Sequence, residues 1–355
     1  MVIDDYINLP QYSLSKDEKK KYFVELMNQL HHHHLQNCDP YEKITKILFN
    51  GVKKISSIEE LPFLPVSLFK TRTLKSIADT DVFKVLTSSG TTGDAPSKIY
   101  LDNKTATLQS RALTKIMTHV LGKNRLPMLI VDSKSVIKDR STYSARGAGI
   151  LGMSIFGKNH EYLLDDNFEI DKDALKRFAE QFNGQPMLIF GFTFMIWKYL
   201  FLKADVKLDL SKAILIHSGG WKKMHDLKIE NDAFKKELEK KFGLKQVYNF
   251  YGMVEQVGSV YMENEKGYLH CPNFSDIIIR NPVDFSVQKI GEEGLVQVVS
   301  VLPQSYPGHS ILTEDIGVCL GEDDLQWKGK YFKILRRVEK ADLRGCSDTF
   351  FIQSN

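Results

Sequence analysis

The sequence contains no apolar run of about 18 residues, and its N-terminal segment lacks the apolar core of a signal peptide. It has only four cysteines, Cys38, Cys271, Cys319 and Cys346, without a C-x-x-C pair, which excludes a zinc-finger framework and a dense disulfide scaffold. A net charge of +4, with no stretch that combines basic and aromatic residues, argues against a nucleic-acid partner. These absences predict a soluble, cytoplasmic protein without a membrane span.

Two common catalytic motifs are also missing. The Walker pattern G-x-x-x-x-G-K-[ST] does not occur, and neither does the G-x-S-x-G of serine hydrolases. The composition is that of a globular protein, with 43% apolar and 26% charged residues, which excludes wholesale disorder, a collagen and a coiled coil. A chain of 355 residues is long enough for more than one packing unit.

The N-terminal region reads as mainly helical. Ser15 and Glu18 form a capping box ahead of an amphipathic helix that ends in four histidines, His31 to His34. Consecutive histidines point in different directions around a helix, so at most two of them can share a metal ion. A polar helix end is therefore favoured over a metal site.

The pattern of apolar residues changes near residue 81. Apolar runs of strand length occur at 82–86, 128–131, 187–190, 213–216 and 246–249. Amphipathic stretches separate several of them, so we expect a largely parallel sheet covered by helices on both faces. After residue 274, the segments SDIIIR, FSVQKI, GLVQVVSV and YFKIL follow one another closely, which predicts an antiparallel or barrel-like part.

Polar loops follow four of the apolar runs, at residues 87–93, 191–193, 217–221 and 250–255. Because the carboxyl ends of parallel strands meet at one edge of a sheet, we expect these loops to form a nucleotide site. The loop TSSGTTG at 87–93 is the strongest signal, since its glycines let the backbone approach an anion and its hydroxyls add donors. The competing interpretation is a flexible turn.

Several of these segments together resemble a known family. SSGTTG, YGMVE, TED and then Arg337 occur in the order found in adenylate-forming enzymes. TSSGTTGDAPSKIYLD, IFGFTFMIW, HSGGWKK, NFYGMVEQ and RGCSDTF are similar to the acyl-protein synthetase (LuxE) family, which is related to phenylacetate-CoA ligases. The resemblance spans residues 87 to 350 and implies an α/β fold. This is the adenylate-forming large domain, with mainly parallel sheets, helices on both faces and a C-terminal β-rich subdomain, the small C-terminal domain being largely absent.

The resemblance also implies a division of the chain. The expected regions are a mainly helical lead-in of the large domain at 1–80, an α/β nucleotide-binding core at 81–273, a β-rich subdomain at 274–335, and a hinge with a truncated remnant at 336–355.

The resemblance implies roles for particular residues. Those expected to hold the ATP phosphates are Thr87, Ser88, Ser89, Gly90, Thr91, Thr92 and Gly93, with help from Lys98. Gly219 and Gly220 would line the adenine slot, with Tyr251 packing on the base, and Gly252 is expected in the same nucleotide site. Glu255 would bind Mg²⁺, and Asp315 would bind the ribose hydroxyls. Arg337, at the expected hinge, would contact the ribose or a phosphate. Val254 and Arg336 depart from the family pattern, which usually has Thr or Ser and then Gly at these places.

The activity implied is ATP-dependent activation of a carboxylic acid, a fatty acid in this family, as acyl-AMP. The acyl group then passes to a protein cysteine thiol, for which Cys346 is the candidate, and an acyl reductase or another protein is the expected partner. Two alternatives stay open: an acyl- or aryl-CoA ligase, and a non-catalytic subunit that binds acyl-AMP as a scaffold. We expect the CoA ligase to be the less favoured alternative, because too few residues follow Arg337 in this sequence to fold as a small domain.

Other polar and aromatic residues keep two interpretations each. His217, beside the Gly-Gly turn, is either a general base or a histidine satisfied by ordinary hydrogen bonds, and the second is favoured. The aromatic residues at 190, 192, 194 and 197 either line an acyl channel or belong to the core.

Overall fold

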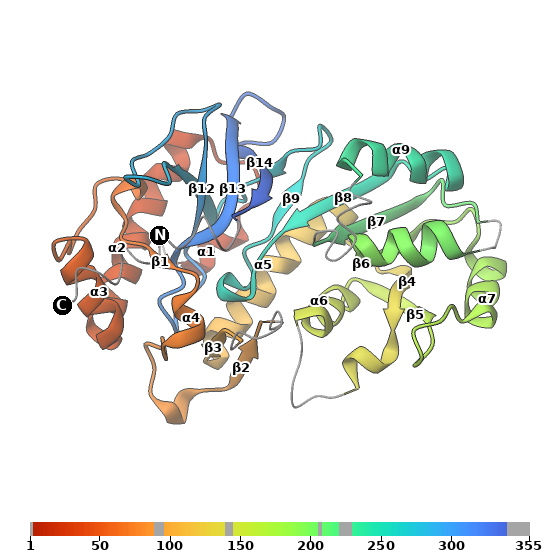
Figure 1. Cartoon of the computed structure of the whole chain (residues 1–355), viewed down its shortest axis with the longest axis horizontal. Helices are drawn as coiled ribbons and strands as arrows, with labels where there is room; N and C mark the ends of the chain where they lie inside the picture. The colour runs from red at the N-terminus through yellow and green to blue at the C-terminus, as the bar shows by residue number, and fades with distance from the viewer. Residues whose placement is uncertain (1–2, 89–95, 139–144, 205–207, 220–228, 339–355) are drawn as a thin grey trace.

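The computed structural model describes residues 3–88, 96–138, 145–204, 208–219 and 229–338 (Figure 1). Five predicted phosphate-loop residues, Gly220 and Cys346 lie outside the described residues; the five are Ser89, Gly90, Thr91, Thr92 and Gly93. In the described ranges, no helix combines the length and the apolar composition that a membrane crossing needs.

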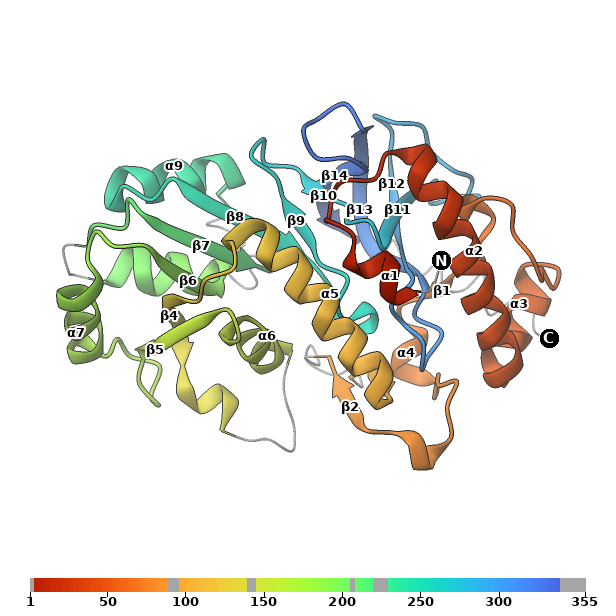
Figure 2. The same cartoon turned by 180° about the vertical axis from the view of Figure 1, so that it is seen from behind.

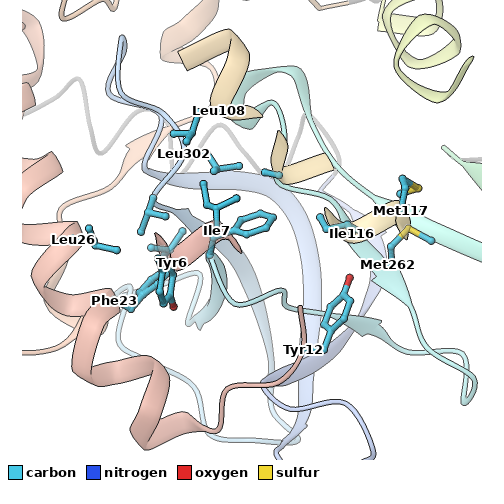
Figure 3. Packing of buried hydrophobic residues seen from close by; sticks show 14 of the residues in the cluster. Tyr6, Ile7, Tyr12, Phe23, Leu26, Leu108, Ile116, Met117, Met262 and Leu302 are labelled. Atoms are coloured by element: carbon cyan, nitrogen blue, oxygen red, sulfur yellow. The ribbon is translucent and has the colours of Figure 1, made fainter. Parts of the chain in front are cut away.

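The N-terminal region is mainly helical, as predicted. It contains α1 (Ile3–Asn8), α2 (Lys16–Asn37), α3 (Asp39–Leu48), the short strand β1 (Leu64–Pro65) and α4 (Leu68–Thr71). Helix α2 begins at the predicted capping box, where the Ser15 backbone N–H donates to the Glu18 carboxylate at 2.9 Å. Its apolar face, which includes Phe23 and Leu26, packs with Tyr6 and Ile7 of α1 in the central core (Figure 3).

A single large sheet of 12 strands forms the centre of the molecule, in the order β11-β12-β13-β14-β10-β9-β8-β7-β6-β4-β5, with β1 paired to β13. Its parallel part consists of β4 (Leu126–Ser133), β5 (Gly157–Leu164), β6 (Met187–Phe192), β7 (Ala213–Ser218) and β8 (Gln246–Tyr251). The apolar runs from 128 onward therefore become neighbouring parallel strands, as expected. Strand β5 was not predicted, because its sequence GKNHEYLL is mostly polar and it lies at the edge of the sheet.

Helices cover both faces of this parallel part. They are α5 (Asn103–Leu121), α6 (Ala145–Ser154), α7 (Lys172–Phe182) and α9 (Asn231–Phe242), together with α8 (Thr193–Met195) and the π-helical segment Ile196–Lys203 that continues it. The long helix α5 runs across one face in Figure 2. Its buried residues and those of α6 pack in the core that includes Ile130 and Ile216, whereas α7 and α9 pack on Leu129 and Leu215 from the other side. The alternation along each strand thus serves two cores.

The later strands are antiparallel, as the closely spaced apolar segments after residue 274 predicted. They are β9 (Tyr261–Glu263), β10 (Leu269–His270), β11 (Ser275–Arg280), β12 (Glu293–Ser300), β13 (Ser310–Glu322) and β14 (Lys330–Arg337). They do not form a separate sheet, because β14 pairs with β10 and β9 pairs with β8. The segment FSVQKI contributes only an isolated bridge at Val287. The predicted domain boundaries stay predictions. Strands from before and after residue 274 belong to the same hydrogen-bonded sheet.

One predicted strand has a different place from the one expected. Strands β2 (Lys84–Thr87) and β3 (Lys98–Leu101) form their own two-stranded antiparallel sheet, which Figure 1 shows apart from the large one. The expectation that the run at 82–86 belongs to the parallel sheet is therefore wrong. The physical reason is burial: a central parallel strand is covered on both faces, whereas Phe83 and Val85 are exposed.

The predicted polar helix end is wrong for two of the four histidines of α2, whereas His32 is exposed and His33 is half-buried. His31 and His34 are fully buried, and both nitrogens of each ring have partners. His31 Nδ1 hydrogen-bonds to the Tyr41 hydroxyl of α3, and the same hydroxyl bonds to Nε2 of His309, which precedes β13. The His34 ring stacks on the His309 ring. Within the part of the chain that the structure describes, no three His, Cys, Asp or Glu side chains gather so that they could hold a metal ion.

Candidate active site

The two ends of the predicted phosphate loop are held together by a pair of serines. The Ser88 backbone N–H donates to the Ser97 carbonyl at 3.2 Å, and the Ser97 N–H donates to Ser88 Oγ at 2.9 Å. Next to these serines, Thr87 of β2 lies directly opposite Lys98 of β3 in the antiparallel pair. Lys98 is exposed. The hairpin therefore presents a hydroxyl-rich loop base with a cation beside it.

The carboxyl ends of β6, β7 and β8 are joined by side-chain hydrogen bonds. The Thr193 hydroxyl, which follows β6, lies 2.7 Å from the carbonyl of Gly219. The Ser218 hydroxyl at the end of β7 donates to the Phe250 carbonyl of β8 at 2.8 Å. Gly219 has a φ of +82°, a left-handed conformation that favours glycine, and a Cβ there would lie 3.1 Å from the Phe192 ring. Three predicted loops thus meet at one edge of the sheet.

Two predicted nucleotide-site residues, 64 positions apart, are in direct contact. The Tyr251 hydroxyl at the end of β8 donates to Asp315 Oδ2 of β13 at 2.7 Å. Burial, and then the charge of Asp315, raises the pKa of Tyr251 well above its ordinary value, so the phenol keeps its proton and remains a donor. Burial also raises the pKa of Asp315, although the bond from Tyr251 acts in the opposite direction.

Arg337 lies opposite Asp315 in the register of β13 and β14. Its guanidinium donates to Glu314 Oε2 at 2.7 Å. Although partial burial acts in the opposite direction, this bond raises the pKa of Arg337 above its ordinary value. Arg336 instead pairs with Glu293 at 3.1 Å. Of these two neighbouring arginines, Arg337 is therefore the one beside the Tyr251–Asp315 pair.

Glu255 sits in the 3₁₀ turn Val254–Gln256 that follows β8, with Gly252 exposed between this turn and the strand. The residue is 7% exposed, and no hydrogen bond or ion pair between described residues involves its carboxylate. The turn is held from behind, because Gln256 Nε2 donates to the Gly308 carbonyl at 3.0 Å. A carboxylate that no described residue engages is available to a cation brought by a ligand. One carboxylate together with substrate phosphates is a common way to hold Mg²⁺.

The sequence interpretation missed one charged pair at the same edge. Asp132, at the end of β4, is buried and takes two bonds from Arg146 in the first turn of α6, one of them from Nε at 2.6 Å. The guanidinium also lies over the Phe168 ring at 5.1 Å. The only available signal was an aspartate directly after an apolar run, which is a weak one. The pair ties α6 to the sheet beside the site.

Comparison with known proteins gives a consistent result. A family model described as "Acyl-protein synthetase, LuxE" matches residues 2–353. A long-chain-fatty-acid–luciferin-component ligase from Vibrio harveyi is 23% identical over 370 residues, which cover 97% of this chain and 92% of that protein. The protein of the same name from Aliivibrio fischeri is 22% identical over 356 residues, with the same coverage.

Solved structures share the fold. An open conformation of 2-hydroxyisobutyryl-CoA ligase, in complex with 2-HIB-AMP and CoA, has a TM-score of 0.69 at 13% identity. The match covers 92% of this chain and 77% of that one. ATP-bound MatB from Rhodopseudomonas palustris has a TM-score of 0.51 at 15% identity, covering 74% of this chain and 49% of that one. At these identities the likeness shows the fold alone, and it confirms the predicted α/β architecture.

Proposed function

The chain belongs to the acyl-protein synthetase (LuxE) family, so it is an ATP-dependent acyl-activating ligase, and we propose that its substrate is a long-chain fatty acid. The substrate follows the names of the two similar ligases. A carboxylate oxygen of the acid attacks the α-phosphorus of ATP, the bond to pyrophosphate breaks, and acyl-AMP forms. The acyl group then passes to a protein thiol. A cytoplasmic location and an acyl reductase partner belong to the same proposal.

The observation that carries the nucleotide site is the Tyr251–Asp315 contact beside Glu255. Asp315 has its Oδ2 occupied by the phenol, which orients the carboxylate so that its other oxygen can accept from ribose hydroxyls. The Tyr251 ring would pack on the base next to Gly219. Glu255 fits as the protein ligand of Mg²⁺, which when bound offsets negative charge on the phosphates.

The hairpin is proposed to hold the phosphates. Thr87 and Ser88 supply hydroxyls at the base of the loop, and Lys98 adds a cation on the adjoining strand. Donors and a cation aimed at the α-phosphate stabilise the negative charge that grows on its oxygens during the attack. Arg337, paired with Glu314 beside Asp315, is placed to approach the ribose or a phosphate.

An acid panel in an ATP–pyrophosphate exchange assay tests this function. We expect exchange to depend on a long-chain fatty acid and to be far weaker with short-chain or aromatic acids. Release of AMP that requires coenzyme A would instead identify an acyl-CoA ligase. Binding of ATP without any acid-dependent exchange would identify a non-catalytic scaffold.

Cys346 is proposed as the thiol that accepts the acyl group. The competing interpretation is an incidental cysteine, which is common. Gly345 allows a close backbone approach and Arg344 favours the thiolate. The thiolate would attack the carbonyl carbon of acyl-AMP, the bond to AMP would break, and the thiol proton would pass to solvent.

We predict that Cys346→Ser keeps pyrophosphate exchange and loses hydroxylamine-sensitive labelling by radioactive fatty acid plus ATP. Cys38→Ser is the matched control, because Cys38 is a buried free thiol in another part of the chain. Equal labelling of the Cys346 variant and wild type would rule out this acceptor.

A further inference from the structure

Thr193 lies at the centre of a small, partly buried hydrogen-bond network between β6 and β7. Its hydroxyl oxygen lies 2.7 Å from the Gly219 carbonyl, 3.2 Å from the Ser218 carbonyl and 2.9 Å from His217 Nδ1. Thr193 is 6% exposed and His217 is 1% exposed. The contact between the two side chains is therefore shielded from bulk water, although Gly219 itself is exposed. Each short contact needs a hydrogen atom from one of the two side chains.

The number of available hydrogens fixes the protonation pattern. A threonine hydroxyl has a single hydrogen, and a carbonyl oxygen at 2.7 Å can only accept it, so this hydrogen points to Gly219. The contact between the hydroxyl oxygen and His217 Nδ1 must then use a hydrogen carried by Nδ1. The proton of the neutral ring therefore sits on Nδ1, and Nε2 carries only a lone pair.

The surroundings of His217 agree with a neutral ring. Nε2 has no hydrogen-bond partner in the described part of the chain, and the Phe234 ring of α9 lies 5.0 Å from the imidazole. Burial, and then the nearby charge of Lys235, lowers the pKa of His217 to about 3. His217 therefore stays neutral at physiological pH and does not titrate as a general base there.

We propose that Thr193 is a positioning residue for the nucleotide. Its hydroxyl, oriented by the Nδ1–H of His217, holds the Gly219 carbonyl and so sets the backbone path at the wall assigned to adenine. Gly219 has a left-handed backbone conformation. Because glycine has more conformational freedom than any other residue, a hydrogen bond to its carbonyl is needed to fix that conformation. The Phe192 ring also lies against this glycine, 3.1 Å from the place that a Cβ would take. The inference rests on the proposed function and adds two residues to its site.

Steady-state pyrophosphate exchange with matched variants tests the inference. Thr193→Val removes the hydroxyl at constant volume, and we expect it to raise the KM for ATP about five- to tenfold while kcat changes by less than about twofold. Thr193→Ser should recover most of the wild-type KM. Thr114→Val, which removes an exposed hydroxyl bonded within α5, is the control for loss of a threonine hydroxyl as such.

The same test can be made from the histidine side, which covers the case in which Thr193→Val does not fold. His217→Asn keeps a donor at the place of Nδ1, whereas His217→Leu removes it. We expect a wild-type KM for ATP in the first variant, the raised KM in the second, and the same pH profile of kcat/KM for wild type and His217→Asn.

Equal KM values for the valine and serine variants, or for the two His217 variants, would overturn the inference while the proposed function stands. A loss confined to kcat would also overturn it, because that is the pattern of a catalytic group or of a smaller folded fraction. A wild-type protein without acid-dependent exchange would overturn the proposed function and this inference together.

Discussion

Two groups of buried polar side chains teach different lessons in this molecule. In the histidine cluster, His31 and His34 use both ring nitrogens on protein partners, and only His309 keeps one nitrogen, Nδ1, without a partner among the described residues. In the candidate site, no hydrogen bond or ion pair between described residues involves the carboxylate of Glu255, a residue that is 7% exposed. The ring nitrogens are used within the protein, whereas a carboxylate that no described residue engages is available to a cation. A charged side chain that no described residue engages is therefore a better indication of a ligand than the residue type is.

The two groups are also connected in space. His309 follows Gly308, whose carbonyl accepts a bond from Gln256, the neighbour of Glu255. A Cβ at Gly308 would lie 2.8 Å from the Glu255 carbonyl, so glycine is required for this close approach. The closed histidine cluster therefore forms the support behind the open site. The comparison predicts that substitutions in the first group change stability and that substitutions in the second change activity.

The largest expected effect is that of Glu255→Gln. Removing a metal-binding charge should reduce acid-dependent ATP–pyrophosphate exchange by more than about a hundredfold, since it removes several kcal/mol of transition-state stabilisation. The thermal midpoint should stay close to that of wild type, because the substitution keeps the shape of the side chain. Glu265→Gln, on the exposed loop after β9, is the matched control. Exchange within about threefold of wild type would refute the assignment of Glu255.

Asp315→Ala sharpens the comparison at the ribose side of the site. A carboxylate that takes charge-assisted bonds from ribose hydroxyls contributes about 1.5–3 kcal/mol, so the Kd for ATP should rise roughly ten- to a hundredfold. Titration calorimetry measures this change directly. Tyr251→Phe removes only the bond that orients the carboxylate and should weaken binding less than Asp315→Ala does. An unchanged affinity in both variants would place the nucleotide elsewhere.

The smallest expected effect concerns the histidine cluster and pH. Burial lowers the pKa of His34 to about 3 and that of His309 well below its ordinary value, so both bind protons less readily in the folded protein than in the unfolded chain. Their contribution to stability is fully present above about pH 6.5 and is lost as the pH falls toward the folded-state values. Each histidine contributes a slope of at most about 1.4 kcal/mol per pH unit.

Urea unfolding at pH 7, 6 and 5 measures this slope. His309→Gln keeps an acceptor for Tyr41 but cannot titrate, so its loss of stability with acidification should be smaller than that of wild type. His32→Gln, an exposed neighbour in α2, should keep the wild-type slope. If His309→Gln and wild type lose stability equally between pH 7 and 5, the cluster is not the source of acid sensitivity.

Several features could be predicted because they depend on local patterns. The apolar runs that became β4, β6 and β7 are continuous and mostly β-branched or aliphatic, as strands covered on both faces must be. Other strands carry no such signal. Strand β13 was missed because Thr313, Glu314 and Asp315 interrupt its apolar pattern, and these are the residues that it brings to the site. A strand that carries functional polar residues is harder to detect by periodicity.

The sequence alone determined the family, the parallel core and the order of the site motifs, because short-range composition and glycine-hydroxyl loops encode them. Tertiary structure decided the rest. Only the register of β13 against β14, and its position relative to β8, brings Tyr251 to Asp315, and only burial turns His31 and His34 into core residues. Pairing between distant segments and exclusion of water are properties of the whole fold, and no local pattern records which polar groups will be left without a partner.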